Sequence, residues 1–422
     1  MTPAVSFSIA TMRLSLHLVL ALASTLLCRT PAHAQTTPLL PSLQQADALG
    51  ADLFARSSST GMVLVVVRNR EVFFRGYGDT APGSGQRPTP DSILRLCSLS
   101  KIFTTDLLTK LVQDGTVHLD DPLQLFTPPH AIVPSRPGHP VTLLSLATHT
   151  SGLPREVGAG PRDAAHFTFP GYTYRWHWLP TQRLHTVPGT AALYSNIGFD
   201  FLGDALAKAA NEPYAKLLAE RTTTPLGMRE TGFTPNAAQC ARLLQGIHNE
   251  GKCTDTQSSA ASAGVYSTAT DMAVWLKYLL GTGAPAIPAQ DPAAQAVYLQ
   301  PETLISQSGL DHAGDPTGIG LGWMHLLPAD DPSSIIEKTG GGAGFVTYIA
   351  LNQPNHAGIF VAFTDGPTQD HYNVFKATNN LLLILSGLPP AFDPSAPKPP
   401  AKPVRKQPRT RAATSSTTSK TS

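Results

Sequence analysis

A serine and a lysine three residues apart, Ser98 and Lys101, are of the types and at the spacing that suit covalent chemistry. From Ser98 onward, apolar residues recur at intervals of three and four, which predicts a helix that stops at Gly115. Residues three apart on a helix share a face, so the Lys101 amine can reach the serine oxygen. Free N–H groups at a helix start favour developing negative charge. The pair predicts a nucleophilic serine that transfers an acyl group.

The same Ser-x-x-Lys spacing occurs again at Ser395 and Lys398, so spacing alone does not identify a site. This second copy lies in a proline-rich segment, which cannot form a helix. An isolated Ser-x-x-Lys is ordinarily a solvated helix start. The hypothesis for Ser98 therefore depends on partners elsewhere in the chain.

Two further motifs follow in chain order. Tyr194 and Asn196 form Tyr-x-Asn, and residues 338–340 form Lys-Thr-Gly. If folding brings the Tyr194 phenol close to the Lys101 and Lys338 ammonium groups, it is pushed toward phenolate and can accept a proton. Tyr194 is therefore an alternative to Lys101 as the general base, and the sequence leaves both open.

Strand signals lie at the two ends of the chain and helix signals lie between them. Gly61–Arg68 and Glu71–Tyr77 are predicted to form a hairpin, and Phe345–Leu351 and Ile359–Thr364 two later antiparallel strands. We expect an α+β (α/β sandwich) fold, in which N- and C-terminal segments form an antiparallel sheet flanked by helices, with an inserted all-helical subdomain. The predicted helices outside the Ser98 segment are Leu43–Phe54, Val141–Thr150, Phe199–Ala210, Asp271–Leu280 and Tyr372–Leu385.

Three other segments have a predicted role. His149, near the end of a predicted helix, is expected to bond backbone carbonyls. The aromatic run Phe167–Trp178 favours a hydrophobic cover over the core, with a substrate groove as the alternative. Gly281–Asp315 has little periodicity and is interpreted as an insertion.

The 422-residue chain is long enough for a large core, and its formal net charge of +2 gives no reason to expect nucleic acid as a partner. Its first 34 residues have the pattern of a signal peptide, with Arg13, the apolar run Leu14–Leu27 and a small-x-small site at Ala32–Ala34. Because that run is short for a bilayer span, we expect an exported protein with no membrane span after cleavage. Cys28 suggests lipidation as an alternative, but Leu27 stands where a small residue is expected.

The predicted domain organisation is a signal peptide at 1–34, one hydrolase domain at 35–388 and a disordered basic tail at 389–422, rich in Pro, Ala, Ser and Thr. The tail is interpreted as solvated, with contact to anionic wall polymer as the alternative. Export permits disulfides, and Cys240 and Cys253 flank a short polar connection, which favours a local bridge. Cys97 is then unpaired, and a small buried residue is a better interpretation of it than a nucleophile.

Taken together, Ser98-x-x-Lys101, Tyr194-x-Asn196 and Lys338-Thr339-Gly340 resemble the serine penicillin-recognising family of penicillin-binding DD-peptidases and serine β-lactamases. A tyrosine in the second motif resembles the class C-like branch. The flanking phrases Thr148–Glu156, Gly61–Val66 and Lys338–Gly342, and the Cys240 and Cys253 pair, are similar to its periplasmic D-alanyl-D-alanine carboxypeptidase/endopeptidase members. Further stretches that match are Pro225–Met228, Gly264–Thr268 and Gly320–Trp323.

The resemblance implies a role for each motif. Ser98 would form the acyl-enzyme, and Asn196 would orient Lys101 and bond the substrate amide. Lys338 and Thr339 would bind the terminal carboxylate of a substrate. Gly340 would let the strand approach the substrate backbone.

The family pattern also implies an oxyanion hole formed by the N–H groups of Ser98 and Gly341. The expected partners are peptidoglycan stem peptides ending in D-Ala, and β-lactam antibiotics as acylating ligands. No cofactor is expected, and the scattered histidines suggest no metal site.

Four functions remain open at this stage. A DD-peptidase is favoured over a β-lactamase, which differs in fast deacylation. A carboxylesterase on the same scaffold is disfavoured, because ester substrates need no grip on a carboxylate. A non-catalytic binding protein is disfavoured because all three motifs are retained.

Overall fold

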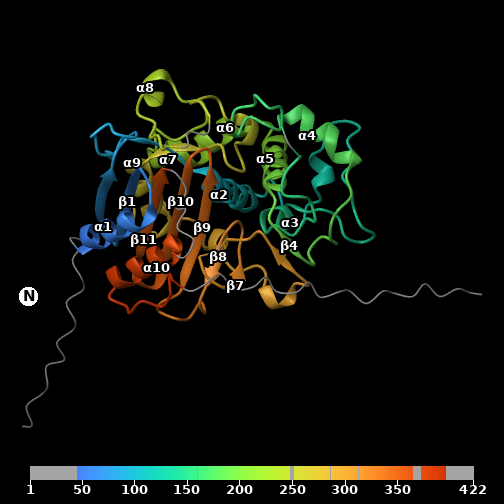
Figure 1. Ribbon diagram of the computed structural model, residues 1–422. Coiled ribbons are helices and arrows are strands. Elements are labelled where there is room, and N and C mark those ends of the chain that lie inside the picture. The colour runs from blue at the N-terminus through green and yellow to red at the C-terminus, as the bar shows by residue number, and fades with distance from the viewer. Residues whose placement is uncertain are drawn as a thin grey trace, which may run out of the picture. The chain divides into compact units, whose positions relative to one another are not determined.

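The computed structural model describes residues 45–158, 160–247, 251–285, 287–311, 313–364 and 372–395. The predicted signal peptide and residues 396–422 of the predicted tail lie outside this range. A seven-stranded sheet, in which each neighbouring pair is antiparallel, has the order β2-β1-β11-β10-β9-β8-β7 (Figure 1). Its strands are β1 Gly61–Arg68, β2 Glu71–Gly78, β7 Pro316–Ile319, β8 Met324–Leu326, β9 Ile335–Gly342, β10 Phe345–Asn352 and β11 Ala357–Thr364.

An N-terminal strand and a C-terminal strand of the described chain pair with each other in this sheet. β1 pairs with β11, with Met62 opposite Phe363 and Arg68 opposite Ala357. The hairpin of β1 and β2 turns at Asn69, whose φ of 54° is a conformation that asparagine tolerates. The predicted sheet, built from N- and C-terminal segments, is confirmed.

Both faces of the sheet are covered, which explains why β1 is apolar throughout. Met62 and Val66 belong to one buried cluster, with α1 (Gln45–Ser57) and α10 (Val374–Leu385), and Figure 1 shows these two helices together beside the sheet. Val63 belongs to the larger cluster on the opposite face, which includes residues of α2 (Ser100–Gln113) and α9 (Ala269–Leu279). The nucleophile segment is therefore built onto the larger core.

The region inserted between β2 and β7 is mainly helical, as expected, but it is not all-helical. Two short two-stranded sheets hold parts of it together: β3 (Ile93–Arg95) pairs with β5 (Tyr266–Thr268), and β4 (Ala192–Leu193) pairs with β6 (Gln307–Ser308). Its other helices are α3 Leu143–Ala147, α4 Tyr172–Trp178, α5 Asn196–Ala210, α6 Tyr214–Leu218, α7 Thr224–Leu226 and α8 Ala237–Cys240. Strands this short give almost no periodic signal, so the sequence did not indicate them.

The described chain continues past Pro389, the predicted start of the tail, to Ser395. Phe392 packs against the cluster beneath α10, and its carbonyl accepts a hydrogen bond of 2.8 Å from Asn380 Nδ2. Residues 389–395 therefore belong with the domain, because an aromatic ring buries its surface there. Each helix in the described part of the chain is too short or too polar to span a bilayer.

Candidate active site

Ser98 lies in a 3₁₀ turn, Cys97–Leu99, that leads directly into α2. The turn is reached through Cys97, which is buried and has a φ of 52°, an uncommon conformation for a residue with a side chain. The carbonyl of Leu96 accepts a 2.8 Å hydrogen bond from Thr347 Oγ1 on β10. The nucleophile is thus held against the central sheet from its N-terminal side.

Gly340 makes this contact possible. A Cβ at Gly340 would lie 2.2 Å from Thr347 Oγ1 and 2.8 Å from the Leu96 carbonyl. The expected approach of a substrate backbone at this glycine stays a prediction, and the structure adds a second reason for the missing side chain. The missing side chain makes room for the segment that carries Ser98.

Lys101 follows one turn after Ser98 and is completely buried. Its Nζ donates to Ser98 Oγ at 3.2 Å, to Asn196 Oδ1 at 2.6 Å and to the Ser262 carbonyl at 2.8 Å. Burial lowers the pKa of Lys101, and the charge of Lys338 lowers it further, against the opposing effect of Tyr194. A lowered pKa is what a lysine needs to take up a proton from serine.

Tyr194 contacts the nucleophile directly, since its hydroxyl donates to Ser98 Oγ at 2.7 Å. The Nζ atoms of Lys101 and Lys338 lie 4.9 and 5.3 Å from the centre of its ring. Burial on its own raises the pKa of the phenol, but the two cations outweigh it and hold the pKa below its ordinary value of 10.0. The phenol and two lysines that the motifs predict are therefore brought together, and both candidate bases touch Ser98.

His149 supports Tyr194 from behind. The rings are stacked with centroids 4.3 Å apart, and His149 Nδ1 accepts the N–H of Ser195 at 3.1 Å. This differs from the expected bonds to backbone carbonyls, because the chain after Tyr194 passes over the imidazole. Burial, followed by the nearby cations, lowers the pKa of His149 well below its ordinary value, so the ring is neutral.

Asn196 is the first residue of α5, whose N-cap is Ser195. Its Oδ1 accepts from Lys101, as the motif predicts, and its Nδ2 donates to Glu156 Oε1. This bond uses one of the two N–H groups of Nδ2, so the predicted bond from Asn196 to a substrate amide stays a prediction. Glu156 was not singled out as a site residue, although it ends one of the flanking phrases.

Lys338 and Thr339 lie on an open edge of β9. In the described part of the chain, β8 pairs with β9 only from Ile335 to Glu337. The side chain of Asp311 binds to this edge. Its Oδ2 lies 2.5 Å from Lys338 Nζ and accepts the Thr339 N–H at 3.1 Å. Asp311 Oδ1 accepts from Thr339 Oγ1 at 2.5 Å. We call these three donors, Lys338 Nζ, Thr339 N–H and Thr339 Oγ1, the carboxylate cradle.

Asp311 comes from the segment that the sequence analysis interprets as an insertion, and no local pattern marks it. Burial lowers the pKa of Lys338, but Asp311 and then Tyr194 and Glu337 together raise it by more, so the net pKa is raised and the lysine stays charged. Lys338 therefore keeps a positive charge beside Tyr194.

A cavity of about 240 Å³ opens beside Ser98. Gly341 lines the same cavity, as the proposed oxyanion hole requires. Asp200 also lines it, and burial raises the pKa of this acid to about 7. The other lining residues are Arg155, Glu156, His166, Phe167, Phe169, Asn196, Ser259, Ser262 and Ala263.

The aromatic run divides between its two predicted roles. Phe167 and Phe169 line the cavity, whereas Trp176 is buried in the larger core and its indole N–H donates to Asp204 at 2.8 Å. The start of the run thus belongs to the groove and its end to the cover.

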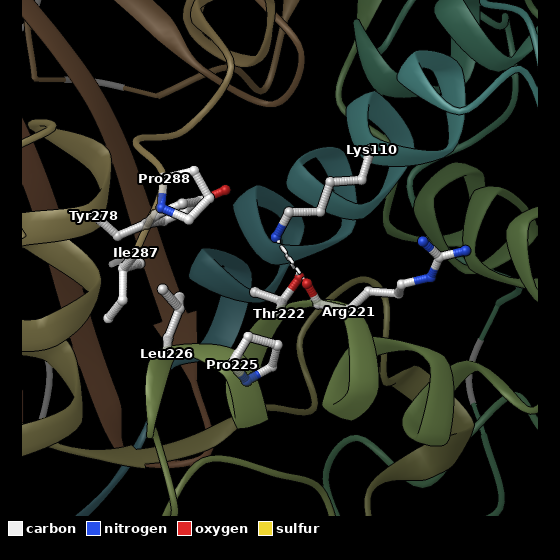
Figure 2. A pocket seen from close by; sticks show the side chains of 8 residues that line it. All are labelled: Lys110, Arg221, Thr222, Pro225, Leu226, Tyr278, Ile287 and Pro288. Atoms are coloured by element: carbon white, nitrogen blue, oxygen red, sulfur yellow. Dashed lines mark hydrogen bonds between the residues drawn. The ribbon is translucent and has the colours of Figure 1, made fainter. Parts of the chain in front are cut away.

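A second cavity, of about 140 Å³, has no connection with the three motifs (Figure 2). Figure 2 shows Lys110 pointing toward Thr222 and Arg221, and its Nζ donates to Thr222 Oγ1 and the Arg221 carbonyl at 3.0 Å. The same amine pairs with Asp106 at 2.7 Å. Its charge is satisfied within the protein, so we assign this cavity no chemistry.

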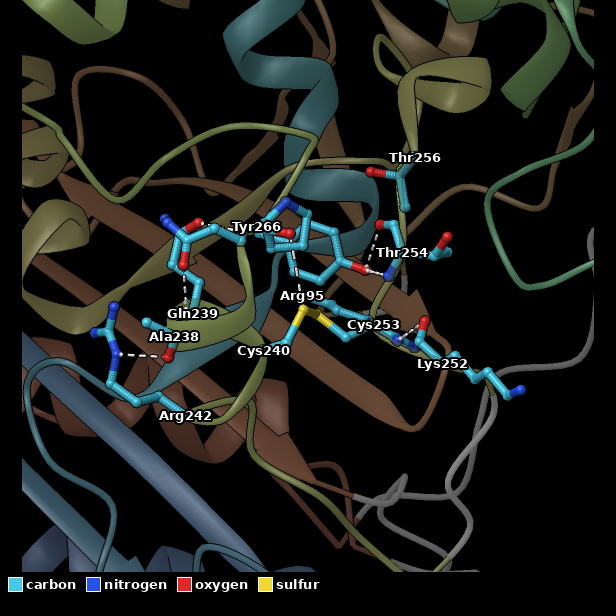
Figure 3. The surroundings of a disulfide bond; sticks show 12 residues. Arg95, Ala238, Gln239, Cys240, Arg242, Lys252, Cys253, Thr254, Thr256 and Tyr266 are labelled. Carbon is cyan, nitrogen blue, oxygen red and sulfur yellow. Dashed lines mark hydrogen bonds between the residues drawn. A yellow bond between two sulfur atoms is a disulfide. The ribbon is translucent and has the colours of Figure 1, made fainter.

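Cys240 and Cys253 are joined in a disulfide, the pairing that their spacing favours (Figure 3). Beside it, Arg95 of β3 donates to the Lys252 carbonyl at 2.8 Å and to the Ala343 carbonyl at 3.2 Å. Ala343 lies in the turn between β9 and β10, two residues after Gly341. The disulfide therefore holds the segment whose carbonyl binds Arg95, and Arg95 in turn binds the turn that follows Gly341. Cys97 is buried and forms no disulfide with another cysteine of the described chain.

Comparison with known proteins agrees with the three motifs. A family model described as β-lactamase matches residues 46–382. The D-alanyl-D-alanine-carboxypeptidase/endopeptidase AmpH of Escherichia coli (strain K12) is 40% identical over 344 residues, which cover 82% of this chain and 89% of that protein.

Solved structures give the same result. The crystal structure of a β-lactamase/D-alanine carboxypeptidase from Yersinia pestis, complexed with citrate, has 41% sequence identity and a TM-score of 0.76, and covers 81% of this chain and 97% of that one. A class C β-lactamase from Rhodobacter sphaeroides, at 23% identity, has a TM-score of 0.61, with 79% of this chain and 96% of that one covered, and shows the shared fold. The resemblance that the motifs predict is confirmed.

Proposed function

The chain belongs to the β-lactamase family, and from this premise we propose that it is a penicillin-binding serine DD-carboxypeptidase/endopeptidase acting on peptidoglycan stem peptides. The observation that carries the proposal is the carboxylate cradle. Lys338 and Thr339 hold a carboxylate next to the Ser98 and Tyr194 pair. A substrate that ends in a free D-Ala carboxylate needs this grip, whereas a simple ester does not.

In the proposed mechanism, Ser98 Oγ attacks the carbonyl carbon of the penultimate D-Ala while its proton passes to Tyr194 or Lys101. The N–H groups of Ser98 and Gly341 stabilise the negative charge on the carbonyl oxygen. The bond to the leaving amine then breaks, and the amine takes the proton from the same base.

The acyl-enzyme ester is released by water. Water attacks the ester carbon and gives its proton back through the base, so that Ser98 Oγ recovers its hydrogen. A β-lactam follows the first half of this path, because ring opening of its amide acylates the same oxygen. A penicillin-binding peptidase and a β-lactamase differ only in the rate of the second half.

The proposal includes export to the periplasm, where stem peptides are found. The charged and apolar pattern of residues 1–34 supports a signal peptide. The family match at 46–382 supports one hydrolase domain, predicted at residues 35–388, and the packing of Phe392 adds residues 389–395 to it. The basic residues beyond Ser395 are proposed to form a solvated tail.

The test is the intact mass of the mature protein, minutes and hours after mixing with benzylpenicillin. A long-lived adduct that is absent from Ser98→Ala but present in Ser84→Ala, a change at an exposed serine, is the expected result. Release of D-Ala from a stem pentapeptide should follow the same order.

Other outcomes reassign the function. Consumption of the antibiotic without a lasting adduct indicates a β-lactamase. Neither adduct nor consumption rules out both and leaves a carboxylesterase or a non-catalytic binder. An adduct that persists in Ser98→Ala shows that Ser98 is not the nucleophile.

A further inference from the structure

The carboxylate cradle is occupied by the protein's own side chain. All three donors point at Asp311, and the side chains of Asp311 and Lys338 are 5% and 1% exposed. The contact joins residues 27 positions apart in the chain. It is therefore a tertiary contact between two separate segments, and not a contact between neighbours along one strand.

The cradle can hold one carboxylate at a time. Lys338 Nζ otherwise donates only to its neighbour's carbonyl, Thr339 O, at 3.0 Å among the described residues, and Thr339 offers one N–H and one hydroxyl. A substrate carboxylate placed beside the Asp311 carboxylate would meet a like group in a buried site, where repulsion between charges is weakly screened. Binding of the substrate carboxylate therefore requires that Asp311 leave the cradle.

The segment that carries Asp311 is anchored at its two ends and is short between them. It starts after β6, which pairs with β4 just before Tyr194, and it ends at β7. Gly309, which has a φ of 70°, and Gly314 flank Asp311 on either side. Leu310 and Ala313 are buried in core clusters, so the departure of Asp311 from the cradle is a movement of its side chain between anchored neighbours.

We propose that Asp311 is a specificity-determining residue, an internal carboxylate that fills the substrate-carboxylate subsite and must be displaced by the incoming one. This inference rests on the proposed function. A ligand displaces Asp311 only if its own carboxylate and its other contacts contribute more binding free energy than the contacts of Asp311 that are lost. Ligands without a carboxylate do not compete with Asp311 and are acylated without displacing it.

The test compares two probes that differ in one group, benzylpenicillin and its methyl ester. The first bears the carboxylate and the second is neutral at that position. Rate constants for acylation of Ser98 are measured by intact mass in the wild type, in Asp311→Asn and in Asp315→Asn. Asp315 is an exposed acid of the same segment and gives the matched change of charge.

We expect Asp311→Asn to raise the ratio of the benzylpenicillin rate to the ester rate by about tenfold or more, the scale of one hydrogen bond to a charged group. Asp315→Asn should leave the ratio unchanged. Any effect of the lost charge on the reactivity of Ser98 acts on both probes and cancels in the ratio. A ratio that is unchanged or lower in Asp311→Asn overturns the inference.

Binding without chemistry separates this inference from the proposed function. In a Ser98→Ala background, calorimetry should show tighter binding of benzylpenicillin when Asp311→Asn is added, with no gain for the ester. If no protein is acylated by either probe but this gain is seen, the proposed function fails and the cradle inference stands. If acylation occurs and the gain is absent, the inference fails alone. Asp311→Ala replaces Asp311→Asn if the latter shows a changed circular dichroism spectrum.

Discussion

The hydroxyl of Tyr194 lies 2.7 Å from Ser98 Oγ, although the two residues are 96 positions apart in the chain. Lys101 reaches the same oxygen at 3.2 Å. The serine thus has two possible proton partners, and they interact with each other, so their titrations are coupled. The first two predictions separate their roles.

Replacing Tyr194 by phenylalanine keeps the ring and its stacking on His149 but removes the oxygen that touches Ser98. We expect the rate of acylation by benzylpenicillin to fall by about 10²–10⁴-fold, the usual contribution of a general base. The measurement is the rate of adduct formation by intact mass. Tyr174→Phe, a change at an exposed tyrosine of α4, is the control and should acylate normally. A Tyr194→Phe enzyme within a factor of about three of the wild type would assign the base to Lys101.

The pH dependence of acylation should reflect the lysines around the phenol. Because the pKa of Tyr194 and that of Lys101 are both lowered, the rate should rise with pH along a limb that lies below the ordinary tyrosine pKa of 10.0. Lys338→Gln removes one of the cations that stabilise phenolate, so the limb should move to higher pH. The neutral methyl ester is the probe, since it does not use the cradle.

Lys216→Gln, at an exposed lysine side chain of α6, is the control for the loss of one charge. Its limb should coincide with that of the wild type. A limb that stays in place in Lys338→Gln would show that the group titrating in the rate profile does not feel this lysine.

Glu337 should make the protein less stable as the pH rises. It is fully buried, its carboxyl oxygens have no hydrogen-bond partner among the described residues, and burial raises its pKa well above 4.5. Above pH 4.5 the unfolded chain loses this proton while the folded protein keeps it, so the free energy of unfolding falls with increasing pH. Glu337→Gln removes this loss.

Denaturant titrations at several pH values test the prediction. The stability gained from Glu337→Gln should be present at pH 8 and should shrink as the pH falls through 4.5. A gain of the same size at every pH would mean that Glu337 is ionised in the folded state or that packing alone is responsible. Glu302→Gln, at an exposed acid, should show no such trend.

The Cys240–Cys253 disulfide should contribute to stability chiefly through the unfolded chain. A bridge that closes a loop with a sequence separation of 13 is worth about 3 kcal/mol in the chain-entropy model. The double variant Cys240→Ser/Cys253→Ser should lose about this much free energy of unfolding, and a reductant should have no further effect on it. A wild-type protein whose stability does not change on reduction would contradict the prediction.

Much of the fold was determined by the sequence alone, for local physical reasons. The two β-rich runs of Gly61–Tyr77 and the turn residues between them specify a hairpin, and the three- and four-residue apolar spacing after Ser98 specifies α2. The same holds for the three motifs, because each is a short run whose residues meet through the geometry of one turn or one strand. Their order along the chain was enough to indicate the family and the proposed chemistry.

Only the tertiary structure decided which groups face one another across the site. Asp311 in the cradle, Glu156 on Asn196, and Gly340 against Thr347 join segments with no shared periodicity. Spacing along a chain describes neighbours one turn or one strand position away, and it carries no information on contacts formed when distant segments pack. The sequence therefore determined that a carboxylate would be bound beside Ser98, and the folded structure decided that the protein's own carboxylate occupies that place.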